Sequence, residues 1–337
     1  MKLVGIATQA LLVASIGASV VASAGCPNED RNQSIKLSND GTSAYGQKQV
    51  DTAIAAYKQA VAKWDKNHSA WYGLGAAYAS KQEWASAAEA MAHAVQIVPD
   101  QAMYQQAYGS ILYDKAIHSA GQGRREGKKS DDPPADLSTV NFEKPLQHLQ
   151  EAVKLNNELW RAHYYIGRIY RDTGKAKEAA TELTNALRFG PTDPGPWVAL
   201  AELYYQWDYT DQGIQIAEVG TTVVPGFNEK SDIWYEVGMG YDEKRFDDRA
   251  IDAFTKALEA KRDHQRAKFQ RGQAYFRKGD YAKAKRDLEE FSKAGGASVE
   301  FAKQQASQML IEIAARSVEP GSTPVEPPAP AKKRKGR

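Results

Sequence analysis

The chain has 337 residues, of which 42% are hydrophobic, so it is long enough to bury a large core. Its 44 lysines and arginines nearly balance its 42 aspartates and glutamates, which argues against nucleic acid as a partner. A single cysteine excludes an internal disulfide framework and any zinc site built from several cysteines.

Residues 1–25 have the pattern of a signal peptide. Lys2 supplies a positive charge, residues 3–21 are apolar or small, and residues 22–24 read Ala-Ser-Ala, a typical cleavage sequence. The pattern predicts an exported protein. An uncleaved membrane anchor fits less well, because polar residues and glycines interrupt the apolar stretch.

The cysteine directly follows this signal. Residues 23–26 read Ser-Ala-Gly-Cys and resemble the bacterial lipobox, although Ser23 stands where that motif usually has leucine. The resemblance implies lipidation of Cys26, and several acyl chains together give stable anchoring. Pro27 replaces the aspartate that marks inner-membrane lipoproteins, so we expect an outer-membrane lipoprotein facing the periplasm. The alternative is cleavage after Ala24, which leaves a soluble periplasmic protein with a free thiol.

After a polar linker at 26–33, apolar and small residues recur with a period of about 34 residues. The clearest unit contains Trp71, Leu74, Gly75, Tyr78, Ala87, Met91, Ala94 and Pro99. The spacing recurs around Gly167, Leu200, Gly238 and Gly272. It resembles the tetratricopeptide repeat, which implies an all-α, right-handed solenoid of helical hairpins. Glycines at 174 and 279 mark turns between the two helices of a hairpin, where a left-handed residue is needed.

The period divides residues 34–298 into seven repeats. Their expected bounds are 34–67, 68–101, 102–159, 160–193, 194–227, 231–264 and 265–298. The third repeat is too long by roughly 24 residues relative to the family period. We expect the excess, 114–140, to form an exposed loop, with Asn141 or a neighbour capping the next helix. This loop either binds a partner or is a tolerated insertion.

The C-terminal residues form two further segments. Apolar residues at helical spacing predict a capping helix at 299–317. Residues 318–337 are rich in proline and end in Lys-Lys-Arg-Lys-Gly-Arg, which predicts a disordered basic tail.

The resemblance also implies a concave groove lined by the first helix of each repeat. The groove positions of repeats four to seven predict a partner-binding set with basic, acidic and basic sections. The set consists of Arg161, Tyr164, Arg168, Arg171, Glu202, Tyr205, Asp232, Tyr235, Asp242, Phe269 and Phe276, and Arg266 and Arg277 supply the charge of the second basic section. Exposed aromatic and charged side chains of this kind suit a protein or peptide partner, although some of these aromatics could pack between repeats instead.

No combination of residues indicates catalysis. The six histidines never lie three or four residues apart, and no nucleophile motif or phosphate-binding loop occurs in a supporting context. We therefore expect a non-enzymatic scaffold without metal or cofactor that helps an envelope complex to assemble, resembling the tetratricopeptide lipoproteins that pilot secretins. The alternative function is a soluble periplasmic adaptor that recruits or restrains a cell-wall enzyme.

Overall fold

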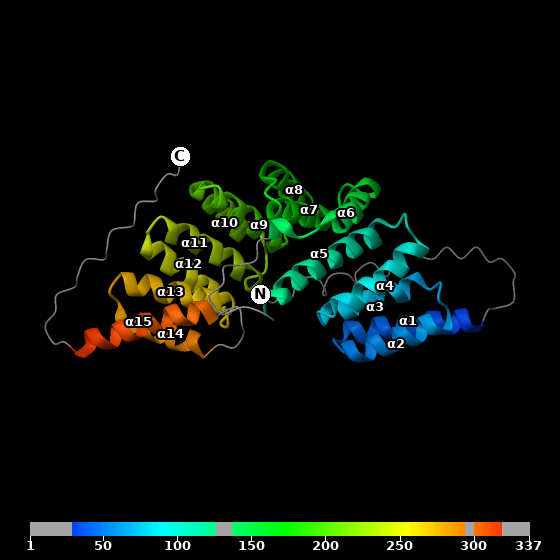
Figure 1. Cartoon of the computed structure of the whole chain (residues 1–337), viewed down its shortest axis with the longest axis horizontal. Helices are drawn as coiled ribbons and strands as arrows, with labels where there is room; N and C mark the ends of the chain where they lie inside the picture. Colours follow the sequence, from blue (N-terminus) through cyan, green and yellow to red (C-terminus); the bar gives the residue numbers. More distant parts are fainter. Residues whose placement is uncertain (1–28, 126–136, 294–299, 319–337) are drawn as a thin grey trace. The chain divides into compact units, whose positions relative to one another are not determined.

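The computed structural model describes residues 29–125, 137–293 and 300–318, and Figure 1 shows that they are almost entirely helical. The signal segment, Cys26, residues 126–136 of the expected loop and the basic tail lie outside the described residues. The helices are α1 (Glu29–Gly46), α2 (Val50–Lys63), α3 (His68–Ser80), α4 (Trp84–Ile97), α5 (Ala102–Arg125), α6 (Glu143–Leu155), α7 (Trp160–Asp172), α8 (Ala176–Phe189), α9 (Pro194–Gln206), α10 (Thr210–Val223), α11 (Ser231–Glu243), α12 (Asp247–Ala260), α13 (Gln265–Arg277), α14 (Tyr281–Ser292) and α15 (Glu300–Val318). Short 3-10 helices precede α6 (Leu137–Thr139) and α11 (Asn228–Lys230). None of the helices in these ranges is long and apolar enough to cross a membrane.

The described helices form two compact units. The first contains α1 to α8, and the second contains α9 to α15. In each unit consecutive helices pair into antiparallel hairpins, for example α1 with α2, α7 with α8 and α11 with α12. The all-α repeat fold expected from the sequence is thereby confirmed.

Close contact within a hairpin depends on small residues at the crossing point. A Cβ atom added to Gly238 of α11 would lie only 2.4 Å from the Phe254 ring of α12. Phe254 is fully buried, together with Ala250 and Ala257 on the same helix. The glycine and the alanines of the repeat pattern therefore allow the two helices to approach each other while a large ring fills the space between them.

The turn inside six of the hairpins has one residue with a positive φ angle. Gly174 and Gly279 have φ angles of 75° and 78°, as the sequence predicts. The same conformation occurs without glycine, with φ of 61° or 62°, at Lys48, Gln82, Asp208 and Arg245. The turn geometry is thus a property of the hairpin that ordinary residues also adopt, at a cost of about 1–2 kcal/mol each.

The third repeat differs from the expected exposed loop. Helix α5 continues to Arg125, so the first part of the expected 114–140 loop is helical, and Asp114 is buried with 4% exposure. Ala116 and Ile117 extend the apolar stripe of α5 and pack against the core around Leu149. This continued stripe is the physical reason that the helix does not stop at the family position. Asn141 accepts a hydrogen bond from the backbone N–H of Glu143 (2.8 Å), as expected for a residue near the start of α6.

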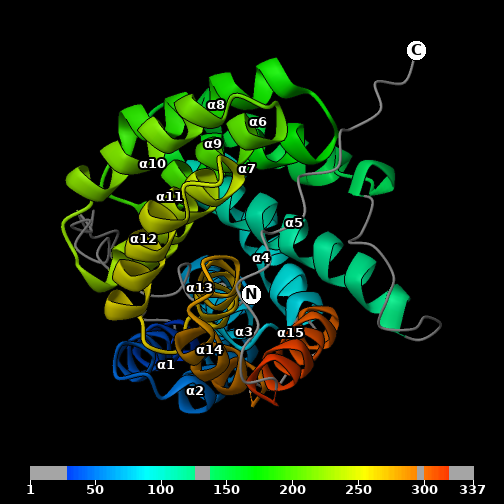
Figure 2. The same cartoon turned by 90° about the vertical axis from the view of Figure 1, so that its left-hand side faces the viewer.

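The two ends of the described chain also have helices. Helix α1 begins at Glu29, so most of the expected linker at 26–33 is helical; Glu29 and Asp30 in its first turn complement the helix dipole. Helix α15 covers the last hairpin by packing on α14 and α13, and Figure 2 shows the three helices side by side. The predicted C-terminal capping helix is therefore present.

Candidate protein-binding surface

First helices of neighbouring hairpins contact one another at two places in each unit. Helix α1 contacts α3 and α5 contacts α7 in the first unit, while α9 contacts α11 and α11 contacts α13 in the second. Each second helix instead packs on the first helix of the following hairpin, as α4 does on α5. We call the surface formed by the first helices the first-helix face of that unit. Stacked repeats of this kind use such a face for binding.

The basic section predicted from the sequence lies on α7, where three of its four residues reach the surface of the first unit. Arg161 is half-buried, and its guanidinium carbon lies 4.7 Å from the centre of the Trp160 ring. Tyr164 is also half-buried. Arg171 forms an ion pair with the neighbouring Asp172, with a closest N–O distance of 3.1 Å.

Arg168 does not fit the predicted role of an exposed groove residue. It is 7% exposed, and its guanidinium carbon lies 4.7 Å from the Tyr113 ring and 5.5–5.6 Å from the rings of Tyr164 and Tyr165. Its buried Nη1 atom has no hydrogen-bond acceptor among the described residues. The assignment of Arg168 as an exposed groove residue is therefore corrected. Aromatic rings enclose its guanidinium group, so the residue is part of the buried layer under the first-helix face.

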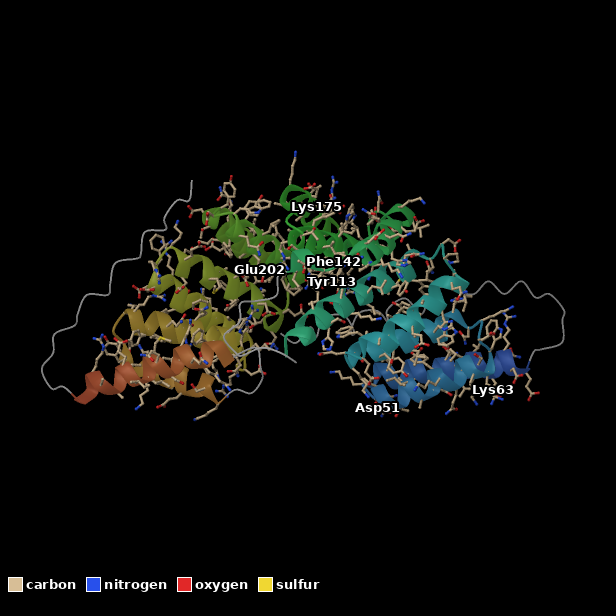
Figure 3. All side chains as sticks on the ribbon, viewed as in Figure 1. Asp51, Lys63, Tyr113, Phe142, Lys175 and Glu202 are labelled. Atoms are coloured by element: carbon tan, nitrogen blue, oxygen red, sulfur yellow. The ribbon has the colours of Figure 1, made fainter. Side chains whose placement is uncertain are left out.

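A buried acid accompanies this arginine. The Tyr165 hydroxyl donates a hydrogen bond to Asp114 (3.3 Å), and burial raises the pKa of Asp114 to about 6, opposed by the positive charge of Arg168. Next to it, the Tyr113 hydroxyl donates to Asp172 (2.6 Å), and Figure 3 shows Tyr113 beside Phe142, with ring centres 5.4 Å apart. Polar groups enclosed in this way fix how α5 and α7 pack together.

From the sequence alone, Tyr113 and Asp114 were not assigned to the first-helix face. They lie four and five residues after Gly109, which is the same register that Arg171 and Asp172 have after Gly167. Counting from the repeat glycine would therefore have placed them on the first-helix face.

In the second unit, acidic residues predicted for the groove pair with basic residues that lie on α13 or directly before it. Asp232 on α11 interacts with His264 (3.1 Å), and the hydrogen bond from His264 lowers the pKa of Asp232. Asp242 forms an ion pair with Arg277 of α13, whose guanidinium also lies 2.7 Å from Asp247. The charges alternate along the sequence as predicted. In the fold, however, the acidic and basic side chains form pairs with one another and do not form separate sections of the face.

The remaining predicted positions of α9 and α11 differ in accessibility. Glu202 and Tyr205 are half-buried, and the Tyr205 hydroxyl donates to the backbone carbonyl of Glu236 (2.8 Å). Figure 3 labels Glu202 on α9. Tyr235 is 5% exposed, and burial raises its pKa to about 12. Tyr235 therefore belongs to the core of its repeat, which corrects its assignment as an exposed groove residue.

The two phenylalanines of α13 also differ. Phe269 is 7% exposed and packs against Phe291 with ring centres 4.9 Å apart, so its assignment as an exposed groove residue is wrong. Phe276 remains half-buried, beside Tyr281 at 5.6 Å. Partner binding at Phe276 and at the other accessible positions stays a prediction.

The first-helix face of the first unit also carries an aromatic group outside the predicted set. The rings of Tyr72 and Tyr104 stack with centres 5.0 Å apart, and the Tyr104 hydroxyl lies 2.8 Å from Nδ1 of His68. Burial raises the pKa of Tyr72 to about 12. Tyr72 and His68 are half-buried and Tyr104 is buried. This group therefore forms a packed aromatic section of the face.

Within the described ranges, no three His, Cys, Asp or Glu side chains are grouped so that they could hold a metal ion. The accessible chemistry of the first-helix faces therefore consists of aromatic rings, guanidinium groups and carboxylates. These groups recognise protein surfaces.

Two units of stacked helical hairpins define an α-solenoid, a class of repeat protein built to bind other proteins. A family model described as "Tetratricopeptide repeat" matches residues 40–102, 141–194 and 243–290. The chain is a tetratricopeptide-repeat protein.

Solved structures support the same fold. One chain of the APC/C hetero-tetramer Cut9-Hcn1 aligns with a TM-score of 0.58 and 12% identity over 84% of this chain and 53% of that chain. This chain thus spans about half of that protein's length. A tetratricopeptide-repeat protein from Parabacteroides merdae aligns with a TM-score of 0.57 and 13% identity over 84% of this chain and 99% of its own.

A third structure, Pseudomonas aeruginosa pilF, aligns with a TM-score of 0.50 and 17% identity over 70% of this chain and 94% of its own. At these identities the similarities show the fold alone. A comparison with curated proteins found no match.

Proposed function

We propose that this protein is a non-catalytic scaffold of a bacterial cell envelope that binds a partner protein or peptide on its first-helix faces. The observation that carries the proposal is the mixed surface on α7, where Arg161 and Tyr164 remain partly accessible beside the buried side chains of Arg168 and Tyr165. Arginine and tyrosine on a firm support contribute strongly to protein interfaces because little side-chain freedom is lost on binding.

The location in the proposal rests on the sequence. The signal-like segment at 1–25 followed by Cys26 supports export and lipid tethering, and Pro27 supports the outer membrane. A tethered scaffold would hold its partner at the membrane and assist the assembly of an envelope complex, as a pilot protein does. A soluble periplasmic adaptor for a cell-wall enzyme is the other function compatible with the same fold.

Cys26→Ser separates these two functions. We expect palmitate to label the wild-type protein and to place it in the membrane fraction, whereas Cys26→Ser should be unlabelled and released. An unlabelled wild-type protein whose mature chain begins at Gly25 would exclude the tether and favour the soluble adaptor.

A second experiment tests the binding face. The variant Arg161→Glu with Tyr164→Ala changes two accessible side chains of α7 and leaves the enclosed Arg168 intact. We expect it to lose the partner that cross-links to the wild-type protein in envelope extracts. Arg188→Glu is the matched control, because it reverses an exposed arginine on α8, outside the first-helix face. Equal recovery of the partner by the double variant would refute binding at α7.

A further inference from the structure

The second unit has two adjoining hollows on the side of its second helices. One has a volume of about 540 Å³ and lies between α10, α11 and α12. The other has a volume of about 460 Å³ and lies around the turn between α11 and α12. The two share Asp248 and Arg249 in their linings, so they adjoin, and we call them together the depression. None of the residues predicted for the groove lines this depression.

The floor of the larger hollow is apolar and aromatic. Trp234, Val237 and Tyr241 line it from α11, and the rings of Trp234 and Tyr241 are only partly buried. Aromatic rings that remain partly accessible at the bottom of a concave surface favour an apolar side chain from a ligand.

The carboxylates of the depression already have partners. Asp247 pairs with Arg277 (2.7 Å), Asp248 pairs with Lys278, and Asp252 pairs with Lys256 (2.7 Å). Glu218 accepts a hydrogen bond from the Tyr241 hydroxyl (2.7 Å). Three of these four carboxylates therefore have cationic partners, whereas Glu218 contacts a neutral hydroxyl.

Arg245 and Arg249 form no ion pair with any carboxylate in the described part of the chain, and both are exposed. The guanidinium carbon of Arg249 lies 5.4 Å from the Tyr241 ring and 5.7 Å from the Phe246 ring. Arg245 occupies the left-handed position of the turn, directly before Phe246. Two guanidinium groups without an ion pair among the described residues therefore lie beside the aromatic floor.

Exposed rings extend this surface along the turns. Phe246 is 46% exposed and precedes α12, and Tyr209 is 54% exposed at the same position before α10. Lys244 links the two turns. It pairs with Asp211 in the first turn of α10, and its Nζ atom lies 5.3 Å from the centre of the Phe246 ring. The corresponding positions of the other hairpins with this turn are polar: Gln49, Glu83, Lys175 and Asp280. Half-exposed aromatics at two neighbouring turns indicate an interaction surface.

We propose that this turn-edge surface, formed by Tyr209, Arg245, Phe246 and Arg249 with the hollow over Trp234 and Tyr241, binds an acidic segment of a partner protein that also carries an apolar side chain. Carboxylates of the segment bind the guanidinium groups of Arg245 and Arg249, which present several donors in a fixed fork. The apolar side chain fills the hollow, and Phe246 and Tyr209 contact the flanking residues. The protein then has a second binding surface, separate from the first-helix face.

Selection from a random 12-residue peptide library displayed on phage tests the proposal without knowledge of the partner. We expect peptides selected on the wild-type protein to include a group enriched in aspartate or glutamate together with an aromatic or aliphatic residue. The affinity of synthetic copies, measured by fluorescence polarisation, should fall by about tenfold or more in Arg245→Glu with Arg249→Glu and in Phe246→Ser. A copy with lysine in place of each acidic residue should not bind the wild-type protein.

Matched variants complete the experiment. Lys285→Glu with Arg286→Glu reverses two exposed charges on α14 of the same unit and should leave the affinity unchanged. Arg161→Glu with Tyr164→Ala should also leave it unchanged, which separates this surface from the proposed function of the first-helix face. If circular dichroism shows that the charge reversal unfolds the unit, Arg245→Gln with Arg249→Gln replaces it. Selection that yields no acidic group, or acidic peptides that bind the arginine variants as tightly as the wild-type protein, overturns the proposal.

Discussion

Replacing Asp114 by asparagine should change how the stability of the first unit depends on pH. Burial raises the pKa of Asp114 from 3.8 to about 6, despite the opposing charge of Arg168. Because the folded unit binds this proton more tightly than the unfolded chain, the ionised carboxylate destabilises the fold. The rise corresponds to about 3 kcal/mol. This penalty is fully present above pH 6, decreases as the pH falls from 6 towards 3.8, and is absent at still lower pH.

Hydrogen exchange of peptides from α5 and α7, corrected for intrinsic exchange rates, measures the effect locally. A local measurement suits a solenoid, whose repeats need not unfold together. Asparagine cannot ionise, so its side chain does not carry this penalty. The free energy of unfolding of Asp114→Asn, taken relative to that of the wild-type protein, should therefore increase by about 2 kcal/mol as the pH rises from 4.5 to 7.5. The gain is smaller than the full penalty because a carboxyl group in the unfolded chain is already mostly ionised at pH 4.5.

The pH dependence of the difference isolates the ionisation of Asp114, because any effect of the amide on packing is present at every pH. Asp100→Asn, which removes an exposed carboxylate just before α5, serves as the control for the loss of a negative charge from this region. If wild-type protein and Asp114→Asn keep the same difference in stability from pH 4.5 to 7.5, the reasoning about the buried carboxylate is refuted.

Three further substitutions test the packing of the second unit, and thermal unfolding and hydrogen exchange can measure all of them. Arg271→Met should destabilise α13 and α14 by about 3–5 kcal/mol, because it leaves the 1% exposed Asp287 buried without its bidentate partner. Lys278→Met should cost no more than about 1 kcal/mol, since both members of its ion pair are exposed; a loss as large as that of Arg271→Met would contradict this distinction. Gly238→Ala should cost about 1–3 kcal/mol, because the added methyl group meets the Phe254 ring; an unchanged stability would show that the ring moves freely.

The repeat spacing predicted the hairpins well because it follows directly from the positions at which the helices pack. Large apolar residues and alanines recur where helices touch, so the hairpins can be counted in the sequence. The turn conformation was predicted at Gly174 and Gly279 only. It was missed at Lys48, Gln82, Asp208 and Arg245, because the hairpin imposes a left-handed residue regardless of local preference.

The length of α5 could not be predicted from the family period. Ala116 and Ile117 continue an apolar stripe, but the glycines and charges that follow suggested a loop, and only the contact with Leu149 shows that the stripe is used. The candidate site has a similar limit. Register places Arg168, Tyr235 and Phe269 on first helices, whereas their burial depends on the rings of neighbouring helices, such as Tyr113 above Arg168. The position of a residue along a helix therefore predicts the direction in which its side chain points better than it predicts how exposed that side chain is.

The distribution of paired charges separates the two binding surfaces of the second unit. On the first-helix face, Asp242 is bound by Arg277, so a charged partner there would have to displace an existing ion pair and would gain little. Aromatic and apolar contacts should therefore dominate at that face. At the turn edge, Arg245 and Arg249 form no ion pair with a carboxylate of the described residues. Affinity at the turn edge should consequently fall as salt is raised, because exposed charges are screened over about 10 Å at 0.1 M, whereas affinity at the first-helix face of this unit should change less.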